Sequence, residues 1–199
     1  MTKHYFSNND DLKHARKYLN FVLRGNEFKF ISDAGVFSKN AVDFGSRVLI
    51  EAFQLNKTTG RILDVGCGYG PIGLAIAKSF PEATIDMVDV NLRALELAKE
   101  NAALNHIQNV QIFESSVYEN VSKTDYQAIL SNPPIRAGKK LVHAILEEAH
   151  GYLADFGELW IVIQKKQGGP SAAKKMEEVF GNVETVVKEK GYFIFKSTK

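Results

Sequence analysis

The fold of this chain is decided by the stretch Asp64-Val65-Gly66-Cys67-Gly68-Tyr69-Gly70, which follows a short apolar segment. Pro71 comes directly after it and suits the first turn of a helix, because that position needs no backbone N–H. Glycines let the backbone turn sharply and approach a ligand closely, with the N-terminus of the helix behind it. The stretch therefore predicts a ligand-binding loop that joins a strand to a helix.

Beyond this loop, strand-like and helix-like patterns alternate along the chain. Short apolar runs predict strands at residues 61–65, 84–89, 110–113, 126–131 and 158–164. Helical spacing of apolar residues predicts helices at 71–80, 92–104 and 139–152, and another after Pro170. Such alternation is typical of a parallel α/β sheet with right-handed crossovers. At the end of the chain, residues 183–188 and 192–196 predict two strands joined at Gly191, which would add an antiparallel strand.

The first third of the chain predicts an extension that precedes the alternating pattern. Residues 18–24 and 27–32 are rich in aromatic and β-branched side chains and meet at Gly25-Asn26, which favours a β-hairpin. Asp43 suits the N-cap of an amphipathic helix that runs to about residue 55. Because no linker or repeat interrupts the chain, we expect one domain over residues 1–199. It would comprise an extension at 1–57 and a core at 58–199.

Composition excludes several classes of protein. Of the 199 residues 45% are hydrophobic and 24% are charged, and the net charge is +2, which is ordinary for a globular domain. The single cysteine, Cys67, forms no internal disulfide, residues 1–11 contain no apolar signal core, and no apolar run is long enough to cross a bilayer. The five histidines lack metal-binding spacing. We therefore expect a cytoplasmic protein without a metal or a membrane contact.

The glycine loop fits two kinds of ligand. Residues 68–73 match the G-x-G-x-x-G fingerprint of dinucleotide-binding folds, so a nicotinamide oxidoreductase is one interpretation. However, a carboxylate at Asp64 would repel a pyrophosphate, whereas it attracts the cationic ammonium and sulfonium groups of S-adenosylmethionine. The same residues resemble the nucleoside loop of Rossmann-like methyltransferases, Asp-x-Gly-x-Gly-x-Gly. Asp89, at the end of the next strand with Val90 beside it, suits ribose hydroxyls in either class. Cys67 is a small loop residue rather than a nucleophile, because the sequence offers no base beside it.

A second motif, Asn132-Pro133-Pro134-Ile135, follows the fourth predicted strand. The carboxyl ends of parallel strands meet at one edge of a sheet, so this tetrapeptide should stand beside the glycine loop. Two prolines fix the backbone and remove two N–H donors, which leaves carbonyl acceptors, and the Asn132 side chain adds another acceptor. Such a group of acceptors suits an –NH₂ substrate, because it holds the hydrogens and stabilises positive charge that develops on nitrogen.

Together these motifs resemble the amino-methylating branch of the class I methyltransferases. More closely, residues 35–38 and 132–139 are similar to the small-methyltransferase-domain family that contains the RsmC-type ribosomal RNA guanine-N2 methyltransferases. This resemblance covers about residues 16–197. It implies a Rossmann-like α/β fold, with a seven-stranded, mostly parallel sheet whose last strand is reversed. It also implies methyl transfer from S-adenosylmethionine to the exocyclic amine of a guanine in ribosomal RNA.

The resemblance also assigns roles to individual residues. For the methyl donor it implies binding by Asp64, Gly66, Cys67, Gly68, Gly70, Asp89, Val90, Ser116, Val117 and Asn132, with Ser116 at the adenine edge and Val117 at its face. Catalysis would fall to the segment 132–135. Many amino methyltransferases carry an aromatic residue where this chain has Ile135, so base stacking would come from elsewhere, and Phe37 is a candidate.

Several amines share this chemistry, namely guanine N2, adenine N6 and a protein glutamine. The basic residues Arg136, Lys139, Lys140, Lys165 and Lys166 follow two neighbouring strands and suit the phosphates around a flipped nucleotide. They favour ribosomal RNA or a ribosomal subunit as the partner. A glutamine methyltransferase of a translation factor and a non-catalytic nucleoside-binding assembly factor remain alternatives, and the oligomeric state stays open.

Overall fold

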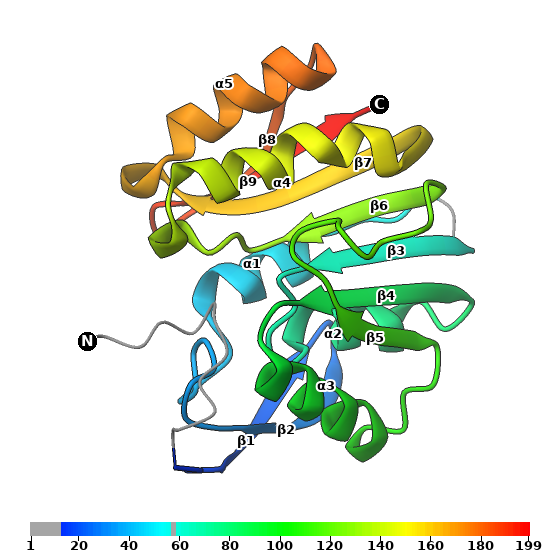
Figure 1. Ribbon diagram of the computed structural model, residues 1–199, viewed down its shortest axis with the longest axis vertical. Helices are drawn as coiled ribbons and strands as arrows, with labels where there is room; N and C mark the ends of the chain where they lie inside the picture. Colours follow the sequence, from blue (N-terminus) through cyan, green and yellow to red (C-terminus); the bar gives the residue numbers. More distant parts are fainter. Residues whose placement is uncertain (1–12, 57–58) are drawn as a thin grey trace.

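The computed structural model describes residues 13–56 and 59–199, and in them the predicted elements occur in the predicted order (Figure 1). The strands are β1 Lys17–Leu23, β2 Asn26–Ser32, β3 Gly60–Val65, β4 Ala83–Asp89, β5 Val110–Glu114, β6 Tyr126–Ser131, β7 Leu153–Gln164, β8 Glu184–Glu189 and β9 Tyr192–Thr198. The helices are α1 Phe44–Ala52, α2 Pro71–Ser79, α3 Leu92–Leu104, α4 Lys139–Tyr152 and α5 Gly169–Phe180, with short 3₁₀ turns η1 Ile135–Ala137 and η2 Lys165–Gln167. The polar segment 1–11 and the expected boundary between residues 57 and 58 lie outside the described residues.

Seven strands form one sheet in the order β5-β4-β3-β6-β7-β9-β8. The strands from β5 to β7 run parallel to one another, whereas β9 is antiparallel to both β7 and β8. The last strand of the chain is therefore reversed and lies between β7 and β8. This confirms the predicted Rossmann-like sheet.

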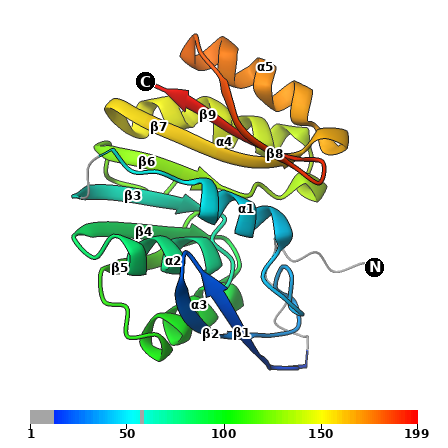
Figure 2. The same ribbon diagram turned by 180° about the vertical axis from the view of Figure 1, so that it is seen from behind.

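Helices cover both faces of the sheet, with α4 and α5 on one face and α1, α2 and α3 on the other (Figures 1 and 2). Successive residues of a strand point to opposite faces, so Ile62 packs into the cluster under α1–α3 while Leu63 packs under α4 and α5. Trp160 and Leu159 divide in the same way on β7. Burial on both faces explains why these central strands read as nearly continuous apolar runs.

The β1–β2 hairpin packs against α3 through two asparagines one helical turn apart. The side chain of Asn101 bonds to both the N–H and the C=O of Ile31 (2.7 and 2.9 Å), and Asn105 does the same with Lys29 (2.9 and 2.8 Å). These amides satisfy the β2 edge as a neighbouring strand would. Asn101 also donates to the carbonyl of Tyr69 (2.9 Å), so the hairpin is tied to the glycine loop.

Helix α1 begins at the predicted cap but ends earlier than expected. Asp43 accepts a hydrogen bond from Ser46 N–H (3.0 Å), whereas the helix stops at Ala52 instead of about residue 55. The Arg24 guanidinium donates to the carbonyls of Ile50 and Phe53 (2.9 and 2.7 Å). A tertiary cap on the last carbonyls thus replaces a further helical turn.

Strand β7 is longer than predicted, because it begins at Leu153, directly after α4, instead of at Glu158. Its pairing with β6 is irregular: Tyr126 faces Leu153, yet Ala128 faces Glu158. Asp155 and Gly157 are residues typical of turns, so the sequence does not predict that the strand begins before them with a bulge.

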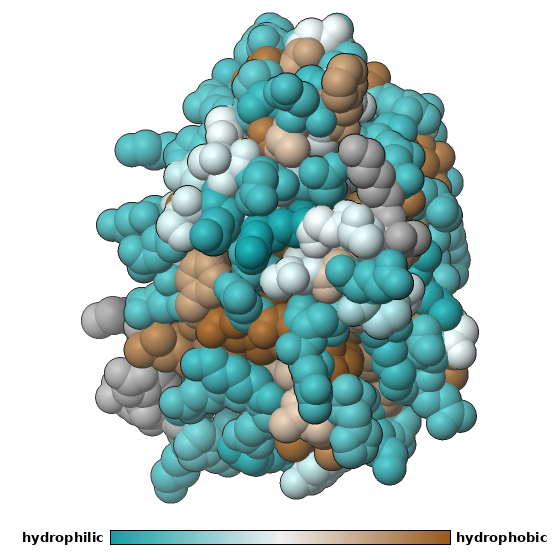
Figure 3. Space-filling model, turned by 90° about the vertical axis from the view of Figure 1, so that its right-hand side faces the viewer, coloured by the Kyte–Doolittle hydropathy of each residue, from teal (hydrophilic) through white to brown (hydrophobic). Residues whose placement is uncertain are grey.

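The molecule has two contrasting edges. Figure 3 views the side on which the parallel strands begin, where the surface is mostly hydrophilic with a hydrophobic band at the height of β4 and β5. The glycine loop and the Asn-Pro-Pro segment lie at the opposite edge, where β3 and β6 end (Figure 1).

Candidate active site

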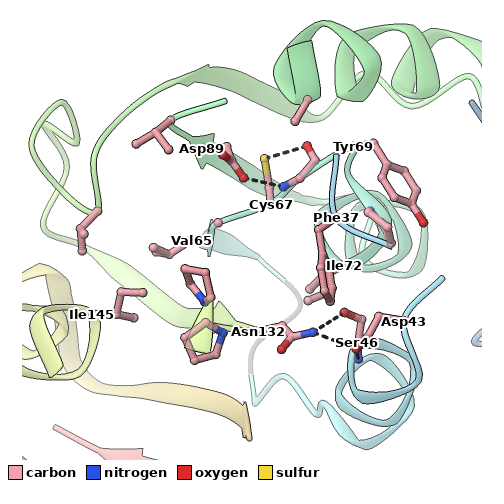
Figure 4. A pocket seen from close by; sticks show the side chains of 18 of the residues that line it. Phe37, Asp43, Ser46, Val65, Cys67, Tyr69, Ile72, Asp89, Asn132 and Ile145 are labelled. Atoms are coloured by element: carbon pink, nitrogen blue, oxygen red, sulfur yellow. Dashed lines mark hydrogen bonds between the residues drawn. The ribbon is translucent and has the colours of Figure 1, made fainter. Parts of the chain in front are cut away.

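A pocket of about 230 Å³ opens where β3, β4 and β6 end (Figure 4). Of the residues predicted from sequence, it is lined by Phe37, Gly66, Cys67, Gly68, Asp89, Val90, Ser116, Val117, Asn132, Pro133 and Pro134. The structure thus brings together segments from five separate parts of the chain. Asp64, Gly70, Ile135 and the five predicted basic residues do not line this pocket.

The shape of the glycine loop depends on backbone hydrogen bonds and on glycines, of which some leave space for a ligand and others allow close packing. The N–H groups of Gly66 and Cys67 both donate to the Val88 carbonyl (2.9 Å each). Gly66 and Gly68 have φ values of +76° and +57°, and a Cβ on either would meet no atom within 4 Å. Their missing side chains therefore leave room for a ligand that approaches the backbone.

Gly70 and Gly73 serve packing instead. A Cβ on Gly70 would lie 2.9 Å from Leu74 Cδ1, and one on Gly73 would lie 2.7 Å from the side chain of Met87. Gly70 also caps α2 with a φ of +100°. Gly70, which was predicted to contact the ligand, therefore packs against the core under the helix and does not line the pocket.

Asp64 lies beneath the loop and is 1% exposed. Its Oδ2 accepts a hydrogen bond from Gly73 N–H (2.8 Å), while Oδ1 is buried without a hydrogen-bond partner among the described residues. Burial raises the pKa of Asp64 to about 7. Direct contact with a ligand in the pocket was expected from the sequence, but the carboxyl group points into the loop that shapes the pocket.

Asp89 is the carboxylate that does line the pocket. Its Oδ2 accepts from Gly68 N–H and its Oδ1 from Asn91 N–H, both at 2.9 Å. Burial raises its pKa, although these backbone hydrogen bonds act in the opposite direction. The carboxylate therefore fixes the loop and still presents negative charge beside Val90.

Cys67 faces the pocket from the loop, and burial raises the pKa of its thiol, as do the charges of Asp89 and Asp64. A thiol with a raised pKa is a poor nucleophile, which agrees with the expectation that it only fills space.

The turn after β5 supplies Ser116 and Val117. Val117 has a φ of +54°, which is uncommon for a β-branched residue. The turn is tied by Ser115, whose hydroxyl donates to the Val117 carbonyl (3.1 Å) and accepts from Asn120 N–H (3.0 Å). This unusual backbone places both predicted residues on the pocket wall.

Asn132 stands opposite Asp89, and its amide orientation is fixed by α1 (Figure 4). The Nδ2 group donates to Asp43 Oδ2 and to Ser46 Oγ, both at 2.9 Å. No hydrogen bond joins Oδ1 to another described residue. Both amide hydrogens are therefore used, and the oxygen is the group left to accept from a substrate.

The prolines offer fewer acceptors than the sequence suggested. The Pro134 carbonyl already accepts from Ala137 N–H (2.8 Å) in the turn η1, so this acceptor is partly used. The expectation that no local donor lies nearby was wrong, because the chain folds back on itself immediately after the prolines.

A second groove of about 400 Å³ adjoins the pocket and shares five residues with it: Phe37, Ser38, Asp43, Asn132 and Pro133. Ile135, Arg136, Gln164 and Tyr192 lie farther along this groove. Asn132 and Pro133 therefore form a wall between two cavities, one of which faces the glycine loop and the other the end of β7 and the beginning of β9.

Of the five predicted basic residues, Arg136 is the one that lines the groove, and none lines the pocket. Arg136 lines the groove, Lys139 and Lys140 begin α4, and Lys165 and Lys166 form η2 after β7. All five are exposed, and none forms an ion pair with another described residue. Since β6 and β7 are neighbours, the two basic segments follow adjacent strand ends.

Apart from Phe37, sequence reasoning missed the contribution of residues 38–46 to this site. Asp43 was expected only as a helix cap and Ser46 was not singled out. The loop before them is tied to the donor side, because Asn91 Nδ2 donates to the Gly35 carbonyl (2.9 Å) and Tyr69 Oη to that of Ala41 (3.3 Å). The sequence signal for them was weak, namely a polar N-cap, Asp43, followed by Ser46 in the first turn of an amphipathic helix.

Two further findings concern the described residues as a set. No group of three or more histidine, cysteine or acidic side chains lies close enough to hold a metal ion in the part of the chain that the structure describes. Within the same residues, no helix is both long enough and apolar enough to cross a membrane.

This sheet, its glycine loop and the Asn-Pro-Pro segment define a methyltransferase of the Rossmann-like class. The model of the methyltransferase small domain family matches residues 27–196, and the chain belongs to that family, whose methyl donor is S-adenosylmethionine. The resemblance inferred from the motifs is thereby confirmed.

Two relatives are similar to the chain in sequence, and one solved structure is similar to it in fold. It is 54% identical, over the full length of both chains, to the uncharacterized protein YbxB of Bacillus subtilis. It is 33% identical to the ribosomal RNA small subunit methyltransferase C of Vibrio vulnificus, an alignment that covers 92% of this chain and 53% of the relative. In fold it is similar to the Thermus thermophilus 16S rRNA N2 guanine methyltransferase RsmC, solved with AdoMet and guanosine. The TM-score is 0.83 at 24% identity, over 94% of this chain and 52% of that one. The chain thus spans about half the length of these two rRNA methyltransferases.

Proposed function

We propose that this chain transfers a methyl group from S-adenosylmethionine to the exocyclic N2 amine of a guanine in ribosomal RNA. The observation that carries the proposal is the Asn132 amide, whose nitrogen is held by Asp43 and Ser46 so that its oxygen is left to accept an N–H. Asn132 belongs to the wall between the two cavities. One cavity suits a methyl donor and the other an acceptor.

The residues of the pocket fit the donor. The open space over Gly66 and Gly68 leaves room for its methionine part, and the Asp89 carboxylate suits its ribose hydroxyls. Ser116 and Val117 would contact the adenine. When bound, S-adenosylmethionine supplies a methyl group on a positively charged sulfur, and the Asp89 carboxylate on the pocket wall favours that charge.

On the acceptor side, the chain positions an amine and stabilises it as it becomes positive. Asn132 Oδ1 would accept one N–H of the –NH₂ group, which directs the nitrogen lone pair toward the methyl group. Well-oriented reactants reach effective molarities on the order of 10⁵ M or more. The proton lost after transfer can leave through the groove to solvent, so no strong base is required.

The surroundings of the groove favour a nucleotide. Phe37, 36% exposed, and Ile135 offer apolar surface for a base. Lys139, Lys140 and Arg136, which form no ion pair with another described residue, suit the flanking phosphates of a flipped nucleotide. The names of the Vibrio and Thermus relatives, which state a small-subunit rRNA substrate, support the same choice. We also propose that the hairpin and the sheet act as one domain, because Leu23 and Phe30 share a core cluster with Ile62.

Transfer of a tritium-labelled methyl group tests the proposal. The purified chain and its Asn132→Ala variant would be incubated with labelled donor and, separately, naked ribosomal RNA, isolated small subunits and a ribosome-free protein extract. We expect label in N2-methylguanine of RNA with the unaltered chain only. Label in glutamine of a protein, or in no acceptor at all, would overturn the proposal.

A further inference from the structure

We infer that Asp43 and Ser46 are positioning residues for methyl transfer, which set the rotation of the Asn132 amide and increase the negative charge on its oxygen. The inference rests on the proposed function and deepens it. Neither residue needs to touch the substrate, since both act through Asn132.

The geometry of the three side chains fixes one of two possible amide orientations. The two hydrogens on Asn132 Nδ2 are taken by Asp43 Oδ2 and Ser46 Oγ at 2.9 Å each. If the amide were rotated by 180°, its oxygen would face the carboxylate oxygen of Asp43 and the two would repel each other. The observed orientation therefore keeps Oδ1 on the side of the cavities.

The carboxylate also acts electronically. A hydrogen bond from an amide N–H to a carboxylate is charge-assisted, and hydrogen bonds in a chain polarise one another. Asp43 would draw the amide hydrogen toward itself and leave Oδ1 a stronger acceptor when the substrate nitrogen becomes positive. Carboxylates that bond to metal-binding histidines act on the ligand in the same way, from the second layer of residues.

A purely structural role would need only part of this arrangement. Capping of α1 uses the hydrogen bond from Ser46 N–H to Asp43 Oδ2 (3.0 Å), whereas the bonds to Asn132 are made in addition and join residues 89 and 86 positions apart. Asparagine caps helices about as well as aspartate. Asp43→Asn should therefore keep the cap and the amide orientation while it removes the charge.

Three variants separate these contributions in single-turnover and steady-state assays with RNA and labelled donor. We expect kcat to fall about tenfold in Asp43→Asn and in Ser46→Ala, and about 100-fold in Asp43→Ala. The KM for RNA and the donor affinity measured by calorimetry should stay within about twofold. Asp125→Asn, which alters an exposed carboxylate just before β6, is the matched control and should keep the original kcat.

A second readout needs neither RNA nor donor. In ¹⁵N-labelled protein, the side-chain amide of Asn132, assigned by its loss in Asn132→Asp, should exchange its hydrogens with water slowly. Exchange should be at least about tenfold faster in Ser46→Ala and Asp43→Ala. If the unaltered chain methylates no RNA, the proposed function fails. The exchange measurement still decides whether Asp43 and Ser46 hold the Asn132 amide in place, an arrangement that we call the clamp.

Three results would overturn the inference: unchanged kcat in both Asp43→Asn and Ser46→Ala, unchanged amide exchange in Asp43→Ala, or a loss of kcat matched by an equal loss of donor affinity. Because Asp43→Asn and Ser46→Ala both retain an acceptor for the first turn of α1, misfolding of Asp43→Ala alone leaves the test intact.

Discussion

The two sides of the pocket are built from contacts of very different length along the chain. The donor side consists of the glycine loop with the ends of β4 and β5, where Asp64 bonds to a residue nine positions away and Asp89 to one 21 positions away. The acceptor side consists of Asn132 with the loop and cap at residues 35–46, and its bonds join residues 86 and 89 positions apart.

This difference indicates that donor binding and methyl transfer depend on largely different structural supports, which hydrogen bonds from Asn91 and Tyr69 to the loop at residues 35–41 join together. The donor side is a local strand–loop–helix unit, whereas the acceptor side exists only when the N-terminal extension packs on the sheet. Changes on one side should therefore leave the activity of the other largely intact.

The sharpest separation is expected from Asn132→Ala. Loss of the acceptor oxygen should lower kcat by about 10³- to 10⁴-fold, because the position of a single preorganised polar group commonly contributes two to three orders of magnitude and orientation adds to it. Donor affinity, measured by calorimetry, should remain within about tenfold. Full turnover by this variant would remove the assigned role of Asn132.

The same difference explains what could be predicted from the sequence. The donor side could be predicted from local patterns, because glycines at a strand–helix junction indicate a ligand-binding loop and an acid at the end of the next strand lies beside it. The clamp at Asp43 and Ser46 could not be found, because which pair of distant polar residues meets depends on how the extension packs. The irregular beginning of β7 was not predicted for a related reason: its turn-forming residues belong to the strand only because they lie next to β6 in the folded sheet.

The location of Asp64 marks the limit of motif reasoning. The pattern placed an acid beside the ligand, yet the fold turns the carboxyl group inward to Gly73 N–H. A motif records which residue is required but not which of its neighbours the side chain contacts.

The buried Asp64 carboxyl group makes a prediction about the donor side alone. Its pKa is raised to about 7 in the folded chain, against an ordinary value near 3.8, so the folded state binds the proton more tightly than the unfolded state. The contribution to stability is fully present below pH 4 and is lost as the pH rises through 7. The loss is up to about 4 kcal/mol, which corresponds to three pH units.

Chemical denaturation between pH 4 and 8 measures this effect. The free energy of unfolding of the unaltered chain should fall over this range relative to that of Asp64→Asn, which cannot ionise. Parallel curves for the two proteins would show that Asp64 does not titrate as its burial implies. Comparison of the two cancels the contribution of Asp89, whose pKa is raised by burial as well.

Substitution of two glycines by alanine tests whether a ligand occupies the open space on the donor side. Gly66 and Gly25 have φ values of +76° and +73°, and a Cβ on either meets no atom within 4 Å. Alanine at each should therefore cost a similar 1 to 2 kcal/mol, roughly, in backbone strain. Only Gly66→Ala should weaken donor binding, by about 10- to 100-fold, whereas Gly25→Ala in the hairpin turn is the control. Equal donor affinity in both variants would mean that the ligand lies elsewhere.

The smallest effect on activity is expected from the basic residues at the beginning of α4. Reversal of charge in Lys139→Glu with Lys140→Glu should raise the KM for RNA about tenfold at low salt. Each phosphate contact contributes about 0.7 to 0.9 to the slope of log affinity against log salt, so the slope should become shallower by at least about 1.4. Donor affinity should not change, because neither side chain lines the pocket.

Reversal of two other exposed lysines gives the matched control for net charge. Lys99 lies on α3 and Lys123 lies before β6, near the edge where the parallel strands begin. If RNA were attracted only by the overall charge of the protein, both double variants would weaken binding equally. A shallower slope in the Lys139 and Lys140 variant alone would place the phosphates near the beginning of α4, because screened charges act over only about 10 Å at 0.1 M salt. An unchanged slope in both variants would mean that these lysines do not contact RNA phosphates and that the groove itself recognises the RNA.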